Sequence, residues 1–150
     1  MTTNIYLDSV LFPICELYKG TYSCDTIPID HHVKASYIVN LSAHDEAGTH
    51  FICIIRRKSY AYYFDSYGLP PFNEDINKYL KSLHIPIYHN DIRIQHDDSK
   101  FCGYFCMLQV LATDTNCKIV PNMNFYVTDT MRNDELCIQY ITKVLDSFRK

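Results

Sequence analysis

The chain has 150 residues, a formal net charge of −3, 47% hydrophobic residues and 21% charged residues. This composition is typical of a globular protein, and the length predicts a single domain, residues 1–150, that can bury an apolar core. The slightly acidic balance gives no electrostatic footprint for nucleic-acid binding, and no stretch approaches the roughly 18 apolar residues of a membrane span.

The amino terminus has neither the basic nor the apolar region of a signal peptide, so we expect an intracellular protein. Its seven cysteines are therefore expected to be free thiols rather than a disulfide framework. The sequence contains no C-x-x-C or H-x-x-x-H pair, so we predict neither a metal site nor a bound cofactor.

The first half of the chain predicts a helix followed by strands. Residues 4–12 predict a short helix that ends before Pro13, and an extended segment begins near Gly20. The apolar, β-branched run at residues 37–41 predicts a strand. The next predicted strand, residues 49–55, is apolar at almost every position, which indicates burial on both faces.

A hairpin is predicted to bring a histidine beside a carboxylate. Residues 56–59 form the predicted loop, and residues 60–65 form a second strand rich in aromatic side chains. Without a bulge, His50 lies opposite Asp65, as Ile55 lies opposite Tyr60. Directly opposed residues share a face of the sheet, with Cβ atoms about 4.5–5.5 Å apart.

The second half predicts three helices and two short strands. Asn73 is a predicted cap for an amphipathic helix whose apolar residues are Ile76, Tyr79, Leu80 and Leu83. Short strands are predicted at residues 85–88 and 92–95. The last two predicted helices run from Cys102 to about Thr113 and from Arg132 to Phe148.

Cys102 stands at the start of an apolar helix, where first-turn N–H groups and the helix dipole stabilise a thiolate. Gly103 leaves room for an approaching carbonyl group. A nucleophilic thiol needs a base, a group that orients the base, and an oxyanion donor. His50, Asp65 and Gln95 are the candidates for these three tasks.

Three motifs in the same order carry a resemblance to a known family. They are G-T-H-F at Gly48–Phe51, Y-Y-F-D-S-Y-G at Tyr62–Gly68, and Gln95 followed after six residues by C-G-Y-F-C at Cys102–Cys106. With them, residues 20–110 resemble the adenovirus-type cysteine endopeptidases, the adenain group, and more distantly the ubiquitin-like-protein-specific proteases of the same fold.

The resemblance implies an α+β fold in which a small mixed sheet packs between helices and the nucleophile begins a buried central helix. It implies that Cys102 is the nucleophile, His50 the general base, Asp65 its orienting acid and Gln95 the oxyanion donor. The implied reaction is hydrolysis after small residues, Gly-Gly or Gly-X, in precursor proteins of a virus or virus-like element. Such an enzyme would act in the host cytoplasm or nucleus, or in the virion.

Two departures from the family limit what carries over. Phe51 replaces the tryptophan of many relatives, and its ring remains available to pack against His50. The adenoviral activating peptide is disulfide-bonded to a cysteine eleven residues before the glutamine, and that position is His84 here. Any activating peptide is therefore expected not to be disulfide-linked.

Three classes of function remain open from the sequence. The first is a protease that matures viral structural precursors. The second is an isopeptidase that removes ubiquitin-like modifiers with the same four residues. The third is an inactive binding module that keeps the fold. The expected partners are protein substrates, with no nucleic acid and no membrane.

Overall fold

The computed structural model describes residues 3–29, 32–45, 50–114 and 124–148. Over these residues the chain has an α+β architecture with four α-helices, a short 3₁₀-helix and five strands. In chain order the elements are α1 (Asn4–Leu11), β1 (Tyr18–Ser23), β2 (Ala35–Asn40), β3 (Phe51–Arg56), β4 (Ala61–Phe64), α2 (Glu74–Ser82), β5 (Ile87–His89), α3 (Cys102–Asp114), η1 (Thr130–Arg132) and α4 (Asn133–Ser147).

The sheet is mixed, and its strands lie in the order β1-β2-β3-β4-β5. The two outer pairs, β1–β2 and β4–β5, are parallel, whereas β2, β3 and β4 pair antiparallel. All six residues of β2 are buried, as are the first five of β3. The predicted burial of β3 on both faces is thus confirmed.

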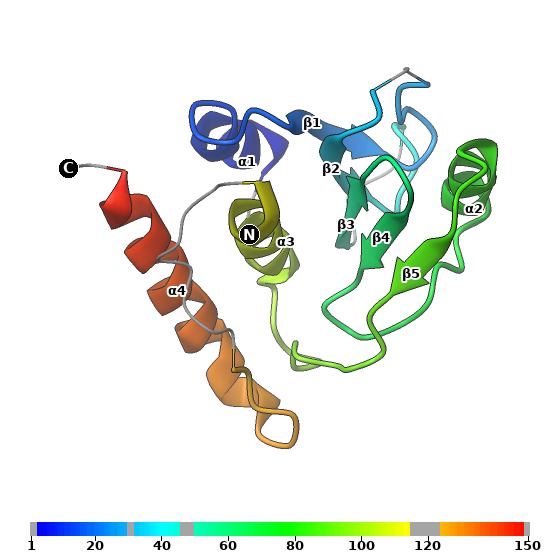
Figure 1. The fold of residues 1–150 in the computed structure, drawn as a ribbon. Coiled ribbons are helices and arrows are strands. Elements are labelled where there is room, and N and C mark those ends of the chain that lie inside the picture. Colours follow the sequence, from blue (N-terminus) through cyan, green and yellow to red (C-terminus); the bar gives the residue numbers. More distant parts are fainter. Residues whose placement is uncertain (1–2, 30–31, 46–49, 115–123, 149–150) are drawn as a thin grey trace.

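Helices cover both faces of the sheet, as predicted. Figure 1 shows α3 between the sheet and α4, and α2 on the opposite side of the sheet. Alternate strand residues point to opposite faces. Ile38, Cys53 and Ile55 pack against α1, α3 and α4, whereas Val39 and Ile52 pack against α2.

Helix α3 is apolar on all sides because it lies in the middle of the core. Its buried residues are Gly103, Phe105, Cys106, Met107, Leu108, Val110 and Leu111. A helix that is hydrophobic all round is typical of a fully buried position. Each fully buried large aliphatic or aromatic side chain contributes about 1.5–3 kcal/mol to the free energy of folding. The buried side chains of α3 therefore hold the sheet and α4 together.

The predicted helix boundaries agree with the structure. The side chain of Asn73 caps α2 by accepting a hydrogen bond from the Ile76 N–H at 3.1 Å. The last helix, α4, begins one residue after the predicted start and follows directly on η1. None of the helices within the described ranges has the length and apolarity needed to cross a membrane.

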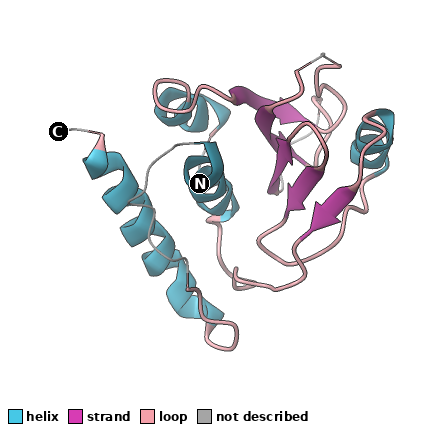
Figure 2. Cartoon of the chain, in the orientation of Figure 1, coloured by secondary structure: helices cyan, strands magenta, loops and turns pink. Residues whose placement is uncertain are grey.

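The strand predicted at residues 92–95 is wrong. Figure 2 shows a long loop, without helix or strand, that links β5 to α3. Within it, the N–H groups of Ile94 and Gln95 both donate to the carbonyl oxygen of Ser66, at 2.9 and 3.0 Å. Consecutive N–H groups of a strand point in opposite directions, so these residues bend around Ser66 instead of pairing in a ladder.

Candidate active site

Cys102 is the first residue of α3, and its side chain is partly buried. Burial raises the pKa of this thiol, but a hydrogen bond to His50 and the backbone N–H groups of Phe51 and Gly103 lower it more. The net effect is a pKa below the usual value of a cysteine. Cys102 therefore ionises more readily than an ordinary buried thiol.

His50 and Asp65 meet through a short hydrogen bond, although the hairpin has a different register from the predicted one. Nε2 of His50 lies 2.8 Å from Oδ1 of Asp65, with side-chain exposures of 11% and 0%. The strands pair Cys53 with Phe64 and Ile55 with Tyr62, two residues away from the predicted pairing. A shift of two preserves the face of each side chain, so the contact survives as a diagonal neighbour.

The hydrogen bonds of His50 define which nitrogen serves which partner. Because Nε2 donates to the Asp65 carboxylate, Nδ1 is the nitrogen that remains for Cys102. Burial lowers the pKa of His50, but the contacts with Asp65 and Cys102 outweigh burial and raise it to about 9. The raised pKa of His50 and the lowered pKa of Cys102 together favour a thiolate–imidazolium ion pair.

A tight turn after β4 presents the Asp65 carboxylate. Oδ1 of Asp65 also accepts a hydrogen bond from the backbone N–H of Tyr67 at 2.8 Å. The N–H of Gly68 donates to the carbonyl oxygen of Asp65 at 2.8 Å, and this bond closes the turn. Gly68 has φ +73°, and a Cβ there would lie 2.8 Å from the backbone nitrogen of Arg93. Only glycine fits both the conformation and the space.

The ring that stacks on His50 is Tyr67, which the sequence did not single out for this position. The two ring centroids are 4.7 Å apart with an angle of 22° between the planes. The guanidinium of Arg93 lies over the same Tyr67 ring, 5.0 Å from its centroid. Arg93 in turn donates from Nε to the carbonyl oxygen of Gln95 at 2.9 Å. Tyr67 and Arg93 therefore connect His50 to the Gln95 segment.

Gln95 is almost completely buried, and its amide joins the two segments that carry Asp65 and Cys102. Oε1 accepts the hydroxyl of Ser66. Nε2 donates to the Ser99 carbonyl oxygen at 3.0 Å and lies 3.3 Å from the Ser99 hydroxyl. The structure thus joins His50, Asp65 and Cys102 directly, and it ties Gln95 to their supporting turns.

The amino-terminal end of α4 supports the Gln95 loop. The fully buried amide of Asn133 donates to the carbonyl oxygens of Ile94 and Tyr126, each at 2.7 Å, and accepts from the Tyr126 N–H at 2.8 Å. The Ser99 hydroxyl donates to Asp134 at 2.7 Å. These polar contacts fix the loop against α4, although no local sequence pattern indicates them.

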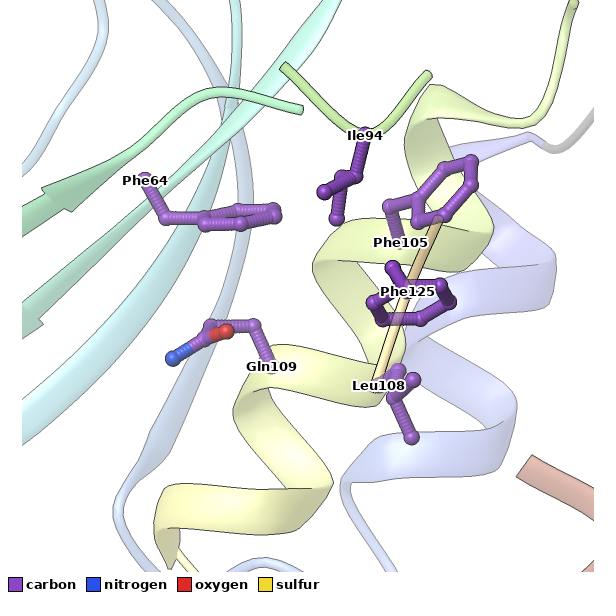
Figure 3. A pocket seen from close by; sticks show the side chains of 6 residues that line it. All are labelled: Phe64, Ile94, Phe105, Leu108, Gln109 and Phe125. Carbon is purple, nitrogen blue, oxygen red and sulfur yellow. The ribbon is translucent and has the colours of Figure 1, made fainter. Parts of the chain in front are cut away.

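A pocket of about 150 Å³ is lined by residues next in sequence to the site, and Figure 3 shows the side chains around it. Three of the residues that line it are close in sequence to site residues. Phe64 precedes Asp65, Ile94 precedes Gln95, and Phe105 follows Cys102 by one helical turn. The other lining residues are Leu108, Gln109 and Phe125. The rings of Phe105 and Phe125 meet edge to face with centroids 5.6 Å apart.

Other sequence expectations fall partly within the described residues. The six described cysteines are free, and all except Cys102 are buried. No group of three or more histidine, cysteine or acidic side chains suited to a metal ion occurs in the part of the chain that the structure describes. Gly48 and Cys117 lie outside that part.

Comparisons of the sequence with protein-family models and with curated proteins find no match to either. A partly buried thiol at a helix start, a histidine that bonds to it, and a buried carboxylate on the other ring nitrogen form the arrangement of a nucleophilic thiol catalyst.

Proposed function

We propose that this protein is a cysteine endopeptidase of the adenain and ubiquitin-like-protease type. The observation that carries the proposal is the position of His50, which bonds through Nε2 to the buried Asp65 and also bonds to Cys102. The order of the sequence motifs and the place of Cys102 at the start of a central helix between sheet and α4 support the same conclusion.

In this mechanism the Cys102 thiolate attacks the carbonyl carbon of the scissile peptide bond. The imidazolium of His50 then gives its Nδ1 proton to the leaving amine, and an acyl-enzyme thioester remains. His50 next takes a proton from a water molecule, which attacks the thioester and releases the acid. Asp65 keeps the imidazole in the orientation and tautomer that both steps require.

The developing oxyanion is stabilised by the backbone N–H of Cys102 and by Nε2 of Gln95. One N–H of Gln95 bonds to the Ser99 carbonyl oxygen at 3.0 Å, whereas the contact with the Ser99 hydroxyl is long, at 3.3 Å. The role of Gln95 as a donor requires the oxyanion to displace this longer contact. Removing such a donor from an enzyme costs about 10²–10³ in rate.

The substrate class follows from the family resemblance. We expect cleavage of Gly-Gly or Gly-X bonds in precursor proteins of a virus or virus-like element. Modifier-linked proteins are the alternative substrates of the same four residues.

A peptide-cleavage assay tests the proposal. A fluorogenic peptide that ends in Gly-Gly is incubated with the wild type, with Cys102→Ala and with Cys106→Ala, each with and without a thiol reductant. Cys106 is the matched control, because it is a fully buried cysteine one turn further along α3. We expect reductant-dependent cleavage that is abolished only in Cys102→Ala.

A thiol-reactive probe supplies a measurement that does not depend on the substrate. The wild type should be labelled rapidly at Cys102 near pH 7. Failure of the probe to label Cys102 would contradict the proposal. Cleavage of modifier fusions without cleavage of Gly-Gly peptides would redirect it to an isopeptidase.

A further inference from the structure

The backbone of Asp65 lies just beyond the end of strand β4. The last pair of the parallel β4–β5 ladder is Tyr63 with His89, so the peptide groups of Asp65 are not bonded by the ladder. A carboxylate that must meet His50 accurately therefore stands at a position where regular sheet pairing has stopped.

A single side chain replaces the missing ladder. Oδ1 of Asn90 accepts the backbone N–H of Asp65 at 2.9 Å, and Nδ2 of Asn90 donates to the carbonyl oxygen of Asp65 at 2.6 Å. In a parallel sheet these two groups would bond to two backbone peptides of the neighbouring strand. Here one amide bonds to both, which fixes Asp65 in position and in rotation.

The carboxylate of Asp65 has few other anchors. Oδ1 bonds to His50 and to the Tyr67 N–H. Oδ2 is buried and makes no hydrogen bond to the described residues. The direction of the carboxylate is therefore set by these two contacts and by the backbone of Asp65, which Asn90 holds at both peptide groups and the Gly68 N–H holds at the carbonyl oxygen.

We propose that Asn90 is a positioning residue of the active site, whose amide holds the Asp65 backbone so that the carboxylate meets Nε2 of His50. The inference rests on the proposed function, because it assigns Asn90 a task in that same site. Among the described residues, the amide of Asn90 bonds to the backbone of Asp65 and of Ile92 but not to His50 or Cys102, so it acts through Asp65.

The proposal predicts a change in proton affinity in addition to any change in stability. Three groups face His50: the Asp65 carboxylate, the Cys102 thiol and the Tyr67 ring, behind which lies the guanidinium of Arg93. Only the Asp65 contact depends on Asn90. A neighbouring opposite charge shifts a pKa by about 1–3, so partial displacement of Asp65 is expected to lower the pKa of His50 by about 1.

The experiment compares Asn90→Ala with Asn77→Ala. Asn77 is the matched control, because its amide also holds a loop carbonyl oxygen, that of Pro71 at 3.2 Å, on the far side of the sheet. The pKa of His50 is read from the NMR titration of its ring, assigned with a His50→Gln variant. The pH dependence of Cys102 alkylation by iodoacetamide is measured in parallel, with Cys102→Ala as background.

We expect Asn90→Ala to lower the pKa of His50 by about 1 and to weaken alkylation near neutral pH, whereas Asn77→Ala leaves both unchanged. In an Asp65→Asn background, Asn90→Ala should have no further effect on either measurement, because its action passes through the carboxylate. If Asn90→Ala does not fold, Asn90→Ser replaces it, since a hydroxyl is too short to bond to both groups of Asp65.

Two results overturn the inference, and they are distinguishable. Unchanged titration of His50 and unchanged alkylation in a folded Asn90 variant refute the role of Asn90 alone. If the wild type itself shows neither a raised pKa for His50 nor rapid alkylation of Cys102, the ion pair is absent, and the proposed function is overturned together with the role of Asn90.

Discussion

Replacement of Asp65 by asparagine separates the charge of this residue from its shape. The asparagine keeps an oxygen for the Tyr67 N–H and for Nε2 of His50, but it removes the negative charge beside the imidazolium. The pair is almost fully shielded from water, with side-chain exposures of 11% for His50 and 0% for Asp65, so solvent screens the charge little. The negative charge of Asp65 should therefore have a large effect on the pKa of His50.

The pKa of His50 gives the size of the effect. A rise from the usual 6.5 to about 9 corresponds to about 3 kcal/mol that favours the charged form in the folded protein. The His50 contribution to stability is complete below pH 6.5 and is lost as the pH rises through about 9. Asp65→Asn removes the carboxylate's share of this rise and leaves burial, which lowers the pKa of His50, and the contact with Cys102, which raises it.

Two assays test this reasoning. Alkylation of Cys102 should shift to higher pH in Asp65→Asn, because the thiolate loses its charged partner. The difference in unfolding free energy between wild type and variant should be larger at pH 6 than at pH 10, by up to about 3 kcal/mol. A suitable control is Asp25→Asn, since Asp25 bonds to the exposed His44. An unchanged alkylation profile in Asp65→Asn would refute the role given to the carboxylate.

Three further substitutions test the supports of the site. Gly68→Ala should lower the free energy of unfolding, measured in urea, by about 2–4 kcal/mol, and by more than Gly20→Ala does. A Cβ at position 68 would lie 2.8 Å from backbone atoms, whereas a Cβ at position 20 would lie no closer than 3.4 Å to any atom outside its chain neighbours. Equal losses in the two variants would contradict this. Asn133→Ala should lower the free energy of unfolding, measured by thermal unfolding, by about 3 kcal/mol, because buried groups such as the Ile94 carbonyl oxygen lose their hydrogen-bond partner. A loss under about 1 kcal/mol would be too small for that explanation. Gln109→Leu should raise the free energy of unfolding, measured in guanidinium, by about 1 kcal/mol, because it places an apolar side chain at the pocket. A lower unfolding midpoint in the variant would contradict this.

The sequence was sufficient for contacts that depend on local periodicity. The spacing of His50 and Asp65 about the hairpin loop predicted that they share a face of the sheet, and this held even though the register differs by two residues. The loop was placed one residue too early, because Arg56 pairs with Ala61 and remains in the strand. Turn composition alone does not distinguish these two registers.

Most contacts between segments distant in sequence have no local pattern that predicts them, and the approach of Cys102 to His50 was expected only from the family resemblance. Asn90 follows a strand and reads as an ordinary turn residue, and its role becomes visible only when β5 is placed beside β4, with α2 between them in the chain. The segment around Gln95 alternates like a strand, yet it bends around Ser66 because both of its N–H groups find the same carbonyl. In both cases long-range hydrogen bonds decide the structure.

The buried thiols of the core can be used to measure local opening of the structure. Cys15, Cys24, Cys53, Cys106 and Cys137 are free and buried, and they lie after α1, after β1, in β3, in α3 and in α4. Burial raises the pKa of each, so none reacts readily while its surroundings remain closed. Pulsed alkylation followed by mass spectrometry can therefore time the opening of each layer separately, with Cys102 marking the intact site.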